Sequence, residues 1–291
     1  MIDLGKAEKL PPEHRYFNIS VLWIFYYRWI LRLFYILKIP HELVTLMSIG
    51  AGLVSAYLFY NGMLLWAAIA LHLKDIFDAC DGALARLTGR GHLIGRYLDS
   101  LGDFLVLTAV MIAIGMRSEN ILGNWTPFWT ALAIWSVFIQ CSFFNYFQLA
   151  YLNVYGVDRL LSRQDENTRP DIDFGNYSPA GRLVLKTLKA LYSIVYSWQD
   201  KFVKNIDEYL LPGGKNNPPE SLYGSKNFMT LISPLCFGTH IFVIIAFALI
   251  DKPAYGLVFI GTVMNIYLLY LLRHRKIALE RQDRRALAAN K

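Results

Sequence analysis

Six mostly apolar stretches, each of about 20 residues or more, follow one another along this chain. A helix of roughly 20 residues is needed to cross the hydrocarbon core of a bilayer, which is about 30 Å thick. The pattern therefore predicts an all-α integral membrane protein with six transmembrane helices. We place them near residues 43–61, 62–82, 97–116, 127–152, 228–250 and 254–272.

A seventh apolar stretch, residues 19–38, differs from the others because Arg28 and Arg32 lie in its middle. A spanning helix would place both guanidinium groups in hydrocarbon, at about 2.5–3.5 kcal/mol each on insertion scales. An amphipathic helix in the membrane interface avoids this cost and keeps aromatic side chains at the level of the headgroups. We therefore expect an N-terminal interfacial amphipathic helix ahead of the first span.

Basic residues outnumber acidic ones in the 291-residue chain, with 29 Lys and Arg against 22 Asp and Glu. They lie in the connections between apolar stretches and in the C-terminal tail, so we expect membrane lipids and no nucleic acid as their partners. Lys and Arg concentrate in the cytoplasmic loops of membrane proteins. Their distribution predicts that both termini, the turn at residues 88–92 and the connection 153–227 face the cytoplasm.

Hydropathy and charge together divide the chain into five parts. Within the long connection, apolar residues recur at helical intervals over residues 180–210 and predict a second amphipathic helix. The parts are a cytoplasmic N-terminus with the interfacial helix (1–42), the first four spans (43–152), the cytoplasmic connection (153–227), the last two spans (228–272) and a basic cytoplasmic tail (273–291).

Four aspartates are concentrated where the second and third spans meet. Asp78 and Asp81 are three residues apart, and Asp99 and Asp103 are four apart, so each pair falls on one face of its own helix. If the two faces meet, they form a site with four carboxylates. Oxygen ligands without His or Cys suit Mg²⁺, Mn²⁺ or Ca²⁺ rather than zinc.

Repulsion between the four carboxylates is a second reason to expect a divalent metal site. Four carboxylates in one site repel one another, and among the residues that frame them with Gly82 and Gly95 only Arg86 would offset them. Bound divalent cations would relieve the repulsion. Gly82 and Gly95 fit either of two roles, close packing of the two helices or room for a phosphate beside the metal.

The spacing of these residues resembles the signature of the CDP-alcohol phosphotransferase family, membrane enzymes of phospholipid biosynthesis. That signature is D-x2-D-G-x2-A-R-x8-G-x3-D-x3-D. The chain matches it at Asp78, Asp81, Gly82, Ala85, Arg86, Gly95, Asp99 and Asp103. It departs from members that begin the first span with Pro-Asn followed shortly by Thr, because Pro40 is followed by His41 and then by Thr45.

The resemblance implies a metal-dependent transferase, which moves a substituted phosphate from a CDP-linked donor to an acceptor hydroxyl and releases CMP. It implies that Asp78, Asp81, Asp99 and Asp103 bind two Mg²⁺ or Mn²⁺ ions. It also implies that Asp103 is the catalytic base, which takes the proton of the hydroxyl. By the same resemblance Gly82, Ala85 and Arg86 contact the cytidine diphosphate, and the protein forms a homodimer with its active site facing the cytoplasm.

Two subclasses of acceptor and donor remain open. One transfers a phosphatidyl group from CDP-diacylglycerol to a polar alcohol, and the other transfers phosphocholine or phosphoethanolamine from its CDP form to the lipid acceptor diacylglycerol.

Three other functions predict different patterns. A cation transporter would carry acidic residues near the middle of several spans, whereas these aspartates cluster at one turn. An isoprenoid diphosphate enzyme would carry adjacent aspartates, and the chain has no Asp-Asp pair. A non-catalytic scaffold would have no need of a complete acidic set.

Overall fold

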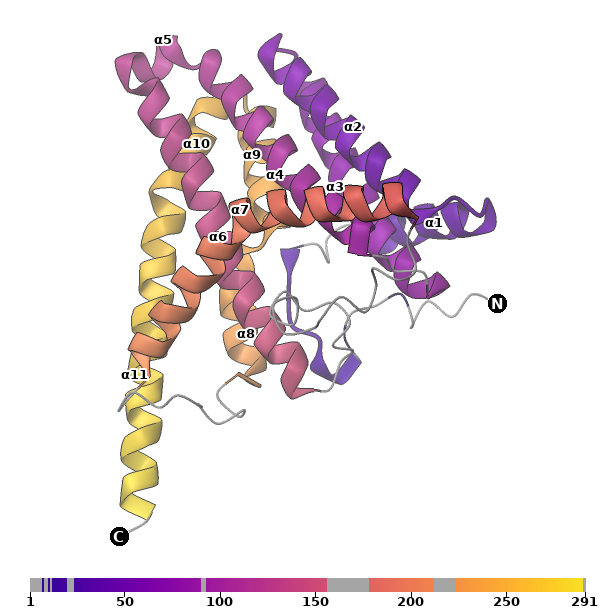
Figure 1. Ribbon diagram of the computed structural model, residues 1–291. Coiled ribbons are helices and arrows are strands. Elements are labelled where there is room, and N and C mark those ends of the chain that lie inside the picture. Colours follow the sequence, from indigo (N-terminus) through magenta and orange to yellow (C-terminus); the bar gives the residue numbers. More distant parts are fainter. Residues whose placement is uncertain are drawn as a thin grey trace.

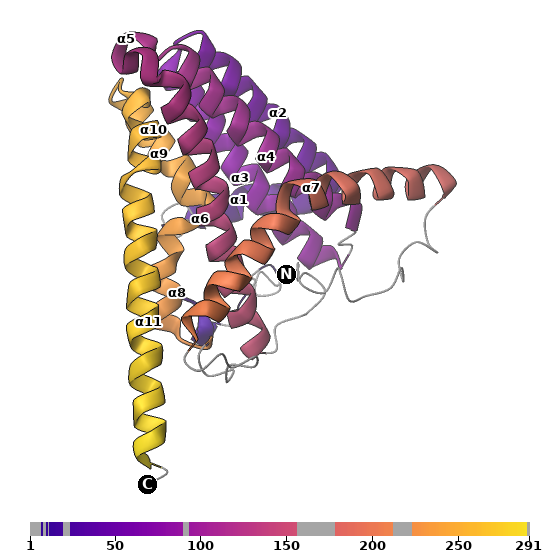
Figure 2. The same ribbon diagram turned by 60° about the vertical axis from the view of Figure 1, so that its left-hand side comes forward.

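Helices follow one another along the chain, and the part that the structure describes contains no strand (Figure 1, Figure 2). The computed structural model describes residues 7, 10, 12–19, 24–89, 93–155, 178–211 and 223–289. The prediction of an all-α protein is confirmed. The helices are α1 (Ile24–Ile36), α2 (His41–Tyr60), α3 (Leu64–Thr88), α4 (Leu93–Met116), α5 (Glu119–Leu122), α6 (Thr126–Val154), α7 (Pro179–Leu210), α8 (Lys226–Ile232), α9 (Phe237–Leu249), α10 (Pro253–Gly261) and α11 (Val263–Ala289).

Four helical segments among the described residues are long and apolar enough to cross a membrane. They are His41–Tyr60, Leu93–Met116, Glu119–Val154 and Pro253–Arg281. Lys226–Leu235 and Phe237–Leu249 make a fifth if the 45° bend between them lies within one span. α3 has a spanning length of 25 residues, but from Lys74 onward it carries this lysine, three aspartates and Arg86, which make it too polar to count with these. Four or five apolar spans are therefore supported, rather than the full six.

The last two predicted spans are each made of two helices. α8 and α9 are separated by a 3₁₀ turn, Ser233–Leu235, whose central residue is Pro234. Proline lacks a backbone N–H and cannot continue the helical hydrogen bonds, which explains the interruption. α11 begins directly after α10 and runs far beyond the predicted end of the span, so most of the basic tail continues this helix.

Small residues bring α2 and α4 into close contact. A Cβ atom on Gly102 of α4 would lie 2.5 Å from Ile49 Cδ1 of α2, and one on Gly52 would lie 2.3 Å from Val106 Cγ1. Helices in membranes often associate through such small residues, because there is little hydrophobic drive for association within lipid. The close approach fixes the position of α4 at the residue next to Asp103.

α1 lies within the apolar stretch 19–38, for which an interfacial helix was expected, and occupies only part of it. It packs against α3, with Leu31 and Phe34 buried beside Ile76 and Cys80. Its other side chains include the exposed apolar residues Trp29, Leu33 and Ile36. The helix thus combines one packed face with an exposed apolar surface.

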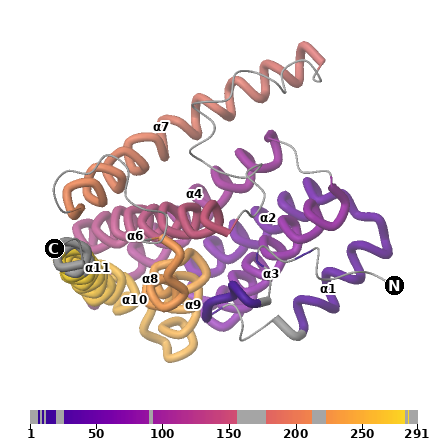
Figure 3. Tube along the Cα trace, turned by 90° about the horizontal axis from the view of Figure 1, so that it is seen from below, coloured from indigo at the N-terminus to yellow at the C-terminus, as the bar shows by residue number. Residues whose placement is uncertain are grey.

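α7 falls in the range where the second amphipathic helix was expected and lies along the outside of the bundle, beside α4 and α6 (Figure 3). Its inner face contributes buried Tyr192 and Tyr196, which pack around Tyr97 of α4. The Tyr196 hydroxyl donates to the Ser100 carbonyl oxygen at 2.7 Å, and Ser142 of α6 donates to Gln199 at 2.7 Å. α7 therefore braces α4 at the residues that flank Asp99.

A buried ion pair attaches the C-terminal end of α7 to α11. Arg275 Nε donates to Asp207 Oδ1 at 2.7 Å, and its guanidinium lies 4.5 Å from the ring centroid of Phe147. Tyr146 and Tyr223 donate to the other oxygen of Asp207. Burial and the bond to Asp207 raise the pKa of the Tyr223 phenol well above its ordinary value, so this phenol stays protonated as a donor.

We expect Asp207→Asn to destabilise the protein by about 3–5 kcal/mol, because it leaves the buried charge of Arg275 without its counter-charge. Thermal or denaturant unfolding of the purified protein in detergent measures this effect. Glu208→Gln is the matched control, because Glu208 belongs to an exposed pair with Lys204 and should cost less than about 1 kcal/mol. Equal effects of the two variants would contradict the anchoring role of Asp207.

Candidate active site

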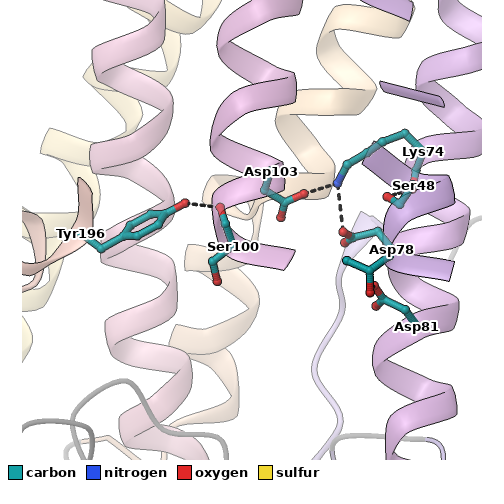
Figure 4. A network of polar contacts seen from close by, with 8 residues as sticks. Ser48, Lys74, Asp78, Asp81, Ser100, Asp103 and Tyr196 are labelled. Atoms are coloured by element: carbon teal, nitrogen blue, oxygen red, sulfur yellow. Dashed lines mark hydrogen bonds and ion pairs between the residues drawn. The ribbon is translucent and has the colours of Figure 1, made fainter. Parts of the chain in front are cut away.

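Two helices bring three of the predicted aspartates together. Asp78 projects from α3, and Asp99 and Asp103 project from α4. One carboxylate oxygen of each lies within 4.8 Å of the corresponding oxygens of the other two. Figure 4 shows Asp78 and Asp103 facing each other across the gap between the helices. All three are half-buried, so they are open to a ligand without being fully solvated.

The fourth aspartate, Asp81, is held on the side of α2. Its side chain is buried, and its Oδ2 accepts a hydrogen bond of 2.6 Å from the Thr45 hydroxyl. Asp81 lies outside the group of three carboxylates whose oxygens converge. Thr45 thus supplies a hydrogen bond that the buried Asp81 carboxylate would otherwise receive from water. The acidic motif alone did not reveal this role of Thr45.

Lys74 lies between the acidic residues of the two helices. Its Nζ donates to Asp78 Oδ1 at 3.0 Å and to Asp103 Oδ1, and it lies 4.6 Å from the ring centroid of Phe237 (Figure 4). The side chain is only 1% exposed. Lys74 is therefore a second counter-charge for the aspartates, in addition to Arg86, and it lies outside the acidic motif. A lysine one helical turn before Asp78 in an apolar stretch was the signal that sequence reasoning missed.

Arg86 binds elsewhere. Its Nε donates to the Ala7 carbonyl oxygen at 2.7 Å, which ties the N-terminal segment to α3. Its guanidinium also lies over Gly82, because a Cβ atom on Gly82 would be 3.4 Å from Nη1. Ala85 is half-buried on the same helix. Gly82 and Arg86, two of the three residues expected to contact the nucleotide, are thus neighbours. Gly82 directly follows Asp81, and Arg86 lies about one turn farther along α3.

Gly95 serves the close packing that was one of its two expected roles. It is buried, and a Cβ atom there would lie 3.4 Å from His41 Nε2. His41 stands at the start of α2, where the signature's relatives often have asparagine. The contact brings the first turn of α4 against the first turn of α2, beside Thr45 and its bond to Asp81.

The donor set fits a divalent cation. Converging carboxylates supply only hard oxygen ligands, which suit Mg²⁺ and Mn²⁺ better than softer metals. Their mutual repulsion would also be relieved by a bound cation. Among the described residues, no other group of three acidic, His or Cys side chains comes as close together.

Comparison with known proteins agrees with this geometry. The sequence model of the family described as CDP-alcohol phosphatidyltransferase matches residues 38–160. That segment includes α2, α3, α4 and α6 and therefore every residue of the acidic motif.

Individual relatives are similar over shorter stretches, of 74 to 89 residues. Archaetidylserine synthase of Methanothermobacter thermautotrophicus is 37% identical over 89 residues, which cover 28% of this chain and 38% of that protein. Phosphatidylinositol phosphate synthase of Mycobacteroides abscessus is 36% identical over 74 residues, covering 25% and 34% of the two chains. Archaetidylinositol phosphate synthase of Pyrococcus horikoshii is 35% identical over 77 residues, covering 26% and 40%.

The chain thus spans no more than about two fifths of the length of these relatives. The segment that matches the family model nevertheless contains Asp78, Asp99 and Asp103, the three aspartates that converge in the structure. Residues 38–160 are therefore similar in sequence to the CDP-alcohol phosphatidyltransferase family, and this similar segment contains the whole acidic motif.

Proposed function

We propose that this protein transfers a phosphatidyl-type group from a CDP-linked lipid to the hydroxyl of a polar alcohol and releases CMP. The observation that carries the proposal is the convergence of Asp78, Asp99 and Asp103 within a segment that matches the family. An oxygen-only site of this kind suits the charge of a diphosphate bound through divalent metal.

The proposed chemistry is an in-line displacement at phosphorus. The acceptor oxygen bonds to the phosphorus that carries the lipid, and the bond from that phosphorus to the CMP oxygen breaks. Two Mg²⁺ or Mn²⁺ ions at Asp78, Asp81, Asp99 and Asp103 would supply charge neutralisation for the diphosphate. Asp103 accepts the proton of the attacking hydroxyl. In this proposal Gly82, Ala85 and Arg86 contact the cytidine diphosphate of the donor.

The arrangement of helices supports a site at the membrane surface. We propose six spans, formed by α2, α3, α4, α6, the bent pair of α8 and α9, and the pair of α10 and α11. The aspartates then lie at the cytoplasmic end of α3 and α4, on the same side as the basic α11 tail. A homodimer is part of the proposal on family grounds alone.

α1 and α7 are proposed to lie in the membrane interface. One flank of α7 exposes apolar side chains and the opposite flank exposes charges. The exposed apolar residues are Leu183, Val184, Leu191, Ile194, Trp198, Phe202 and Tyr209. Trp198 stacks on Trp135 of α6, with ring centroids 4.8 Å apart, so this flank is continuous with the exposed apolar surface of a span. That continuity is expected of an interfacial helix.

A cation transporter receives no comparable support. Among the described residues, the part of α3 before Lys74 (64–73) and the part of α4 after Asp103 (104–116) contain no Asp or Glu. α6 has none over its whole length. Conduction through the bilayer would need polar ligands along the whole path.

The first prediction concerns the acceptor. We expect CMP release with CDP-diacylglycerol and a polar alcohol, since the relatives are named for lipids whose headgroups are serine or inositol phosphate. A panel of CDP donors and alcohols, scored by CMP release and by mass spectrometry of the lipid, measures this. Release only with CDP-choline or CDP-ethanolamine and diacylglycerol would assign the other subclass. No release with any pair from folded protein would contradict the proposed function.

Replacing the proposed base provides the second prediction. We expect Asp103→Asn to lower turnover by about 10²–10⁴-fold, because an amide cannot accept the proton. The assay is CMP release at saturating donor and acceptor. Asp251→Asn is the matched control, because Asp251 lies in the turn between α9 and α10, and it should keep full activity. Normal turnover by Asp103→Asn would remove this residue from the proton transfer.

Removal of metal provides the third prediction. We expect a chelator to stop CMP release, and Mg²⁺ or Mn²⁺ to restore it, because the carboxylates repel one another and the diphosphate without a cation. Asp78→Asn and Asp99→Asn should each raise the Mg²⁺ concentration needed for half-maximal activity. Full activity in excess chelator would contradict a metal mechanism.

A further inference from the structure

Lys74 is an unusual residue to find inside a cluster of carboxylates that fits divalent cations. It is a buried ammonium, on a helix whose neighbours α2 and α9 cover it almost completely. Its backbone is fixed as well, because Ser48 of α2 donates to the Lys74 carbonyl oxygen at 3.0 Å. The family signature begins four residues later, at Asp78, so it does not cover this position.

The ammonium uses oxygens that a metal would need. Its Nζ donates to Oδ1 of Asp78 and to Oδ1 of Asp103, and these residues supply two of the three converging carboxylates. A divalent cation bound by the same carboxylates would stand within a few ångströms of the lysine's positive charge. Two cations that close in a partly buried site repel each other strongly.

Without Lys74, the metal-free site would be hard to keep assembled. Asp78 and Asp103 lie on different helices, and the lysine supplies the direct ion pairs between them. Leaving buried carboxylates without a counter-charge is strongly unfavourable. The lysine therefore stabilises the same arrangement of α3 and α4 that a metal would stabilise.

We propose that Lys74 is a built-in counter-cation, which holds Asp78 and Asp103 together in the metal-free protein and competes with divalent cations for them. The inference rests on the metal site of the proposed function. The flexible four-carbon side chain of Lys74 lets the ammonium withdraw from the carboxylates while the Lys74 backbone stays in place. The affinity of the site for a divalent cation consequently depends on how strongly the Lys74 ammonium competes with that cation for Asp78 and Asp103.

The test compares Lys74→Met with wild type by calorimetric titration of Mg²⁺ into chelator-stripped protein, and by thermal unfolding in chelator. We expect the variant to bind Mg²⁺ more tightly by about tenfold or more, because the competing charge is gone. We also expect it to unfold at a lower temperature in chelator, and to gain more thermal stability than wild type when Mg²⁺ is added.

Two further variants separate charge from general damage. Lys74→Arg keeps the positive charge and should bind Mg²⁺ within about threefold of wild type. Lys204→Met makes the same change as Lys74→Met at an exposed position on α7 and should alter neither affinity nor stability in chelator. If Lys74→Met does not stay folded in chelator, its unfolding temperature is measured over a series of Mg²⁺ concentrations. The Mg²⁺ concentration that gives half of the maximal rise in unfolding temperature should be lower than for wild type.

The outcomes distinguish this inference from the proposed function. Unchanged or weaker Mg²⁺ binding by Lys74→Met, with normal binding by wild type, would overturn the competition and leave the transferase proposal intact. Tight binding by Lys74→Arg would overturn it as well, because charge would then not be the cause. Failure of wild-type protein to bind Mg²⁺ would overturn both.

Discussion

Asp78, Asp99 and Asp103 converge to within 4.8 Å at the meeting of two helices in a largely apolar bundle, and the repulsion between like charges at that distance must be balanced. In the metal-free protein the Lys74 ammonium provides part of the balance. Because the ammonium pairs with both α3 and α4, the same interaction joins the two helices that carry the site. Helix packing and site chemistry therefore depend on one set of charges.

Two neighbouring helices, α2 and α7, support this arrangement. α2 approaches α4 closely at Gly102 and holds Asp81 through Thr45. α7 supports α4 from outside the bundle, through the bond from Tyr196 to the Ser100 carbonyl, and is itself anchored by Asp207 to α11. A residue pair near the C-terminus thus contributes to the position of Asp99 and Asp103, although it lies far from them in sequence.

Much of the site was predictable from sequence, because helical spacing is local. The intervals between Asp78 and Asp81, and between Asp99 and Asp103, fix which residues share a helix face, and a short turn brings the faces together. Lys74 was missed because its role depends on where α4 lies, which spacing within α3 does not determine. The separate position of Asp81 likewise depends on Thr45, which belongs to a third helix.

The fold shows the same division between local and tertiary information. Amphipathic spacing predicted α7, yet nothing in residues 180–210 alone identifies α4 as the helix that it braces. Hydropathy located the last two apolar stretches but did not reveal the bend at Pro234 or the extension of α11 beyond the span. The bend depends on a single proline, and the extension of α11 involves contacts with α7. A hydropathy profile, which averages over many residues, registers neither.

Locating the metal directly tests the central claim, that one carboxylate site is shared in turn by Lys74 and a divalent cation. The measurement is an experimental structure of the protein with bound Mn²⁺, whose position is identified by anomalous scattering. The account expects Mn²⁺ coordinated by Asp78, Asp99 and Asp103, with the Lys74 ammonium withdrawn from Asp78 and Asp103. Mn²⁺ bound elsewhere, with Lys74 still bridging the two aspartates, would contradict it.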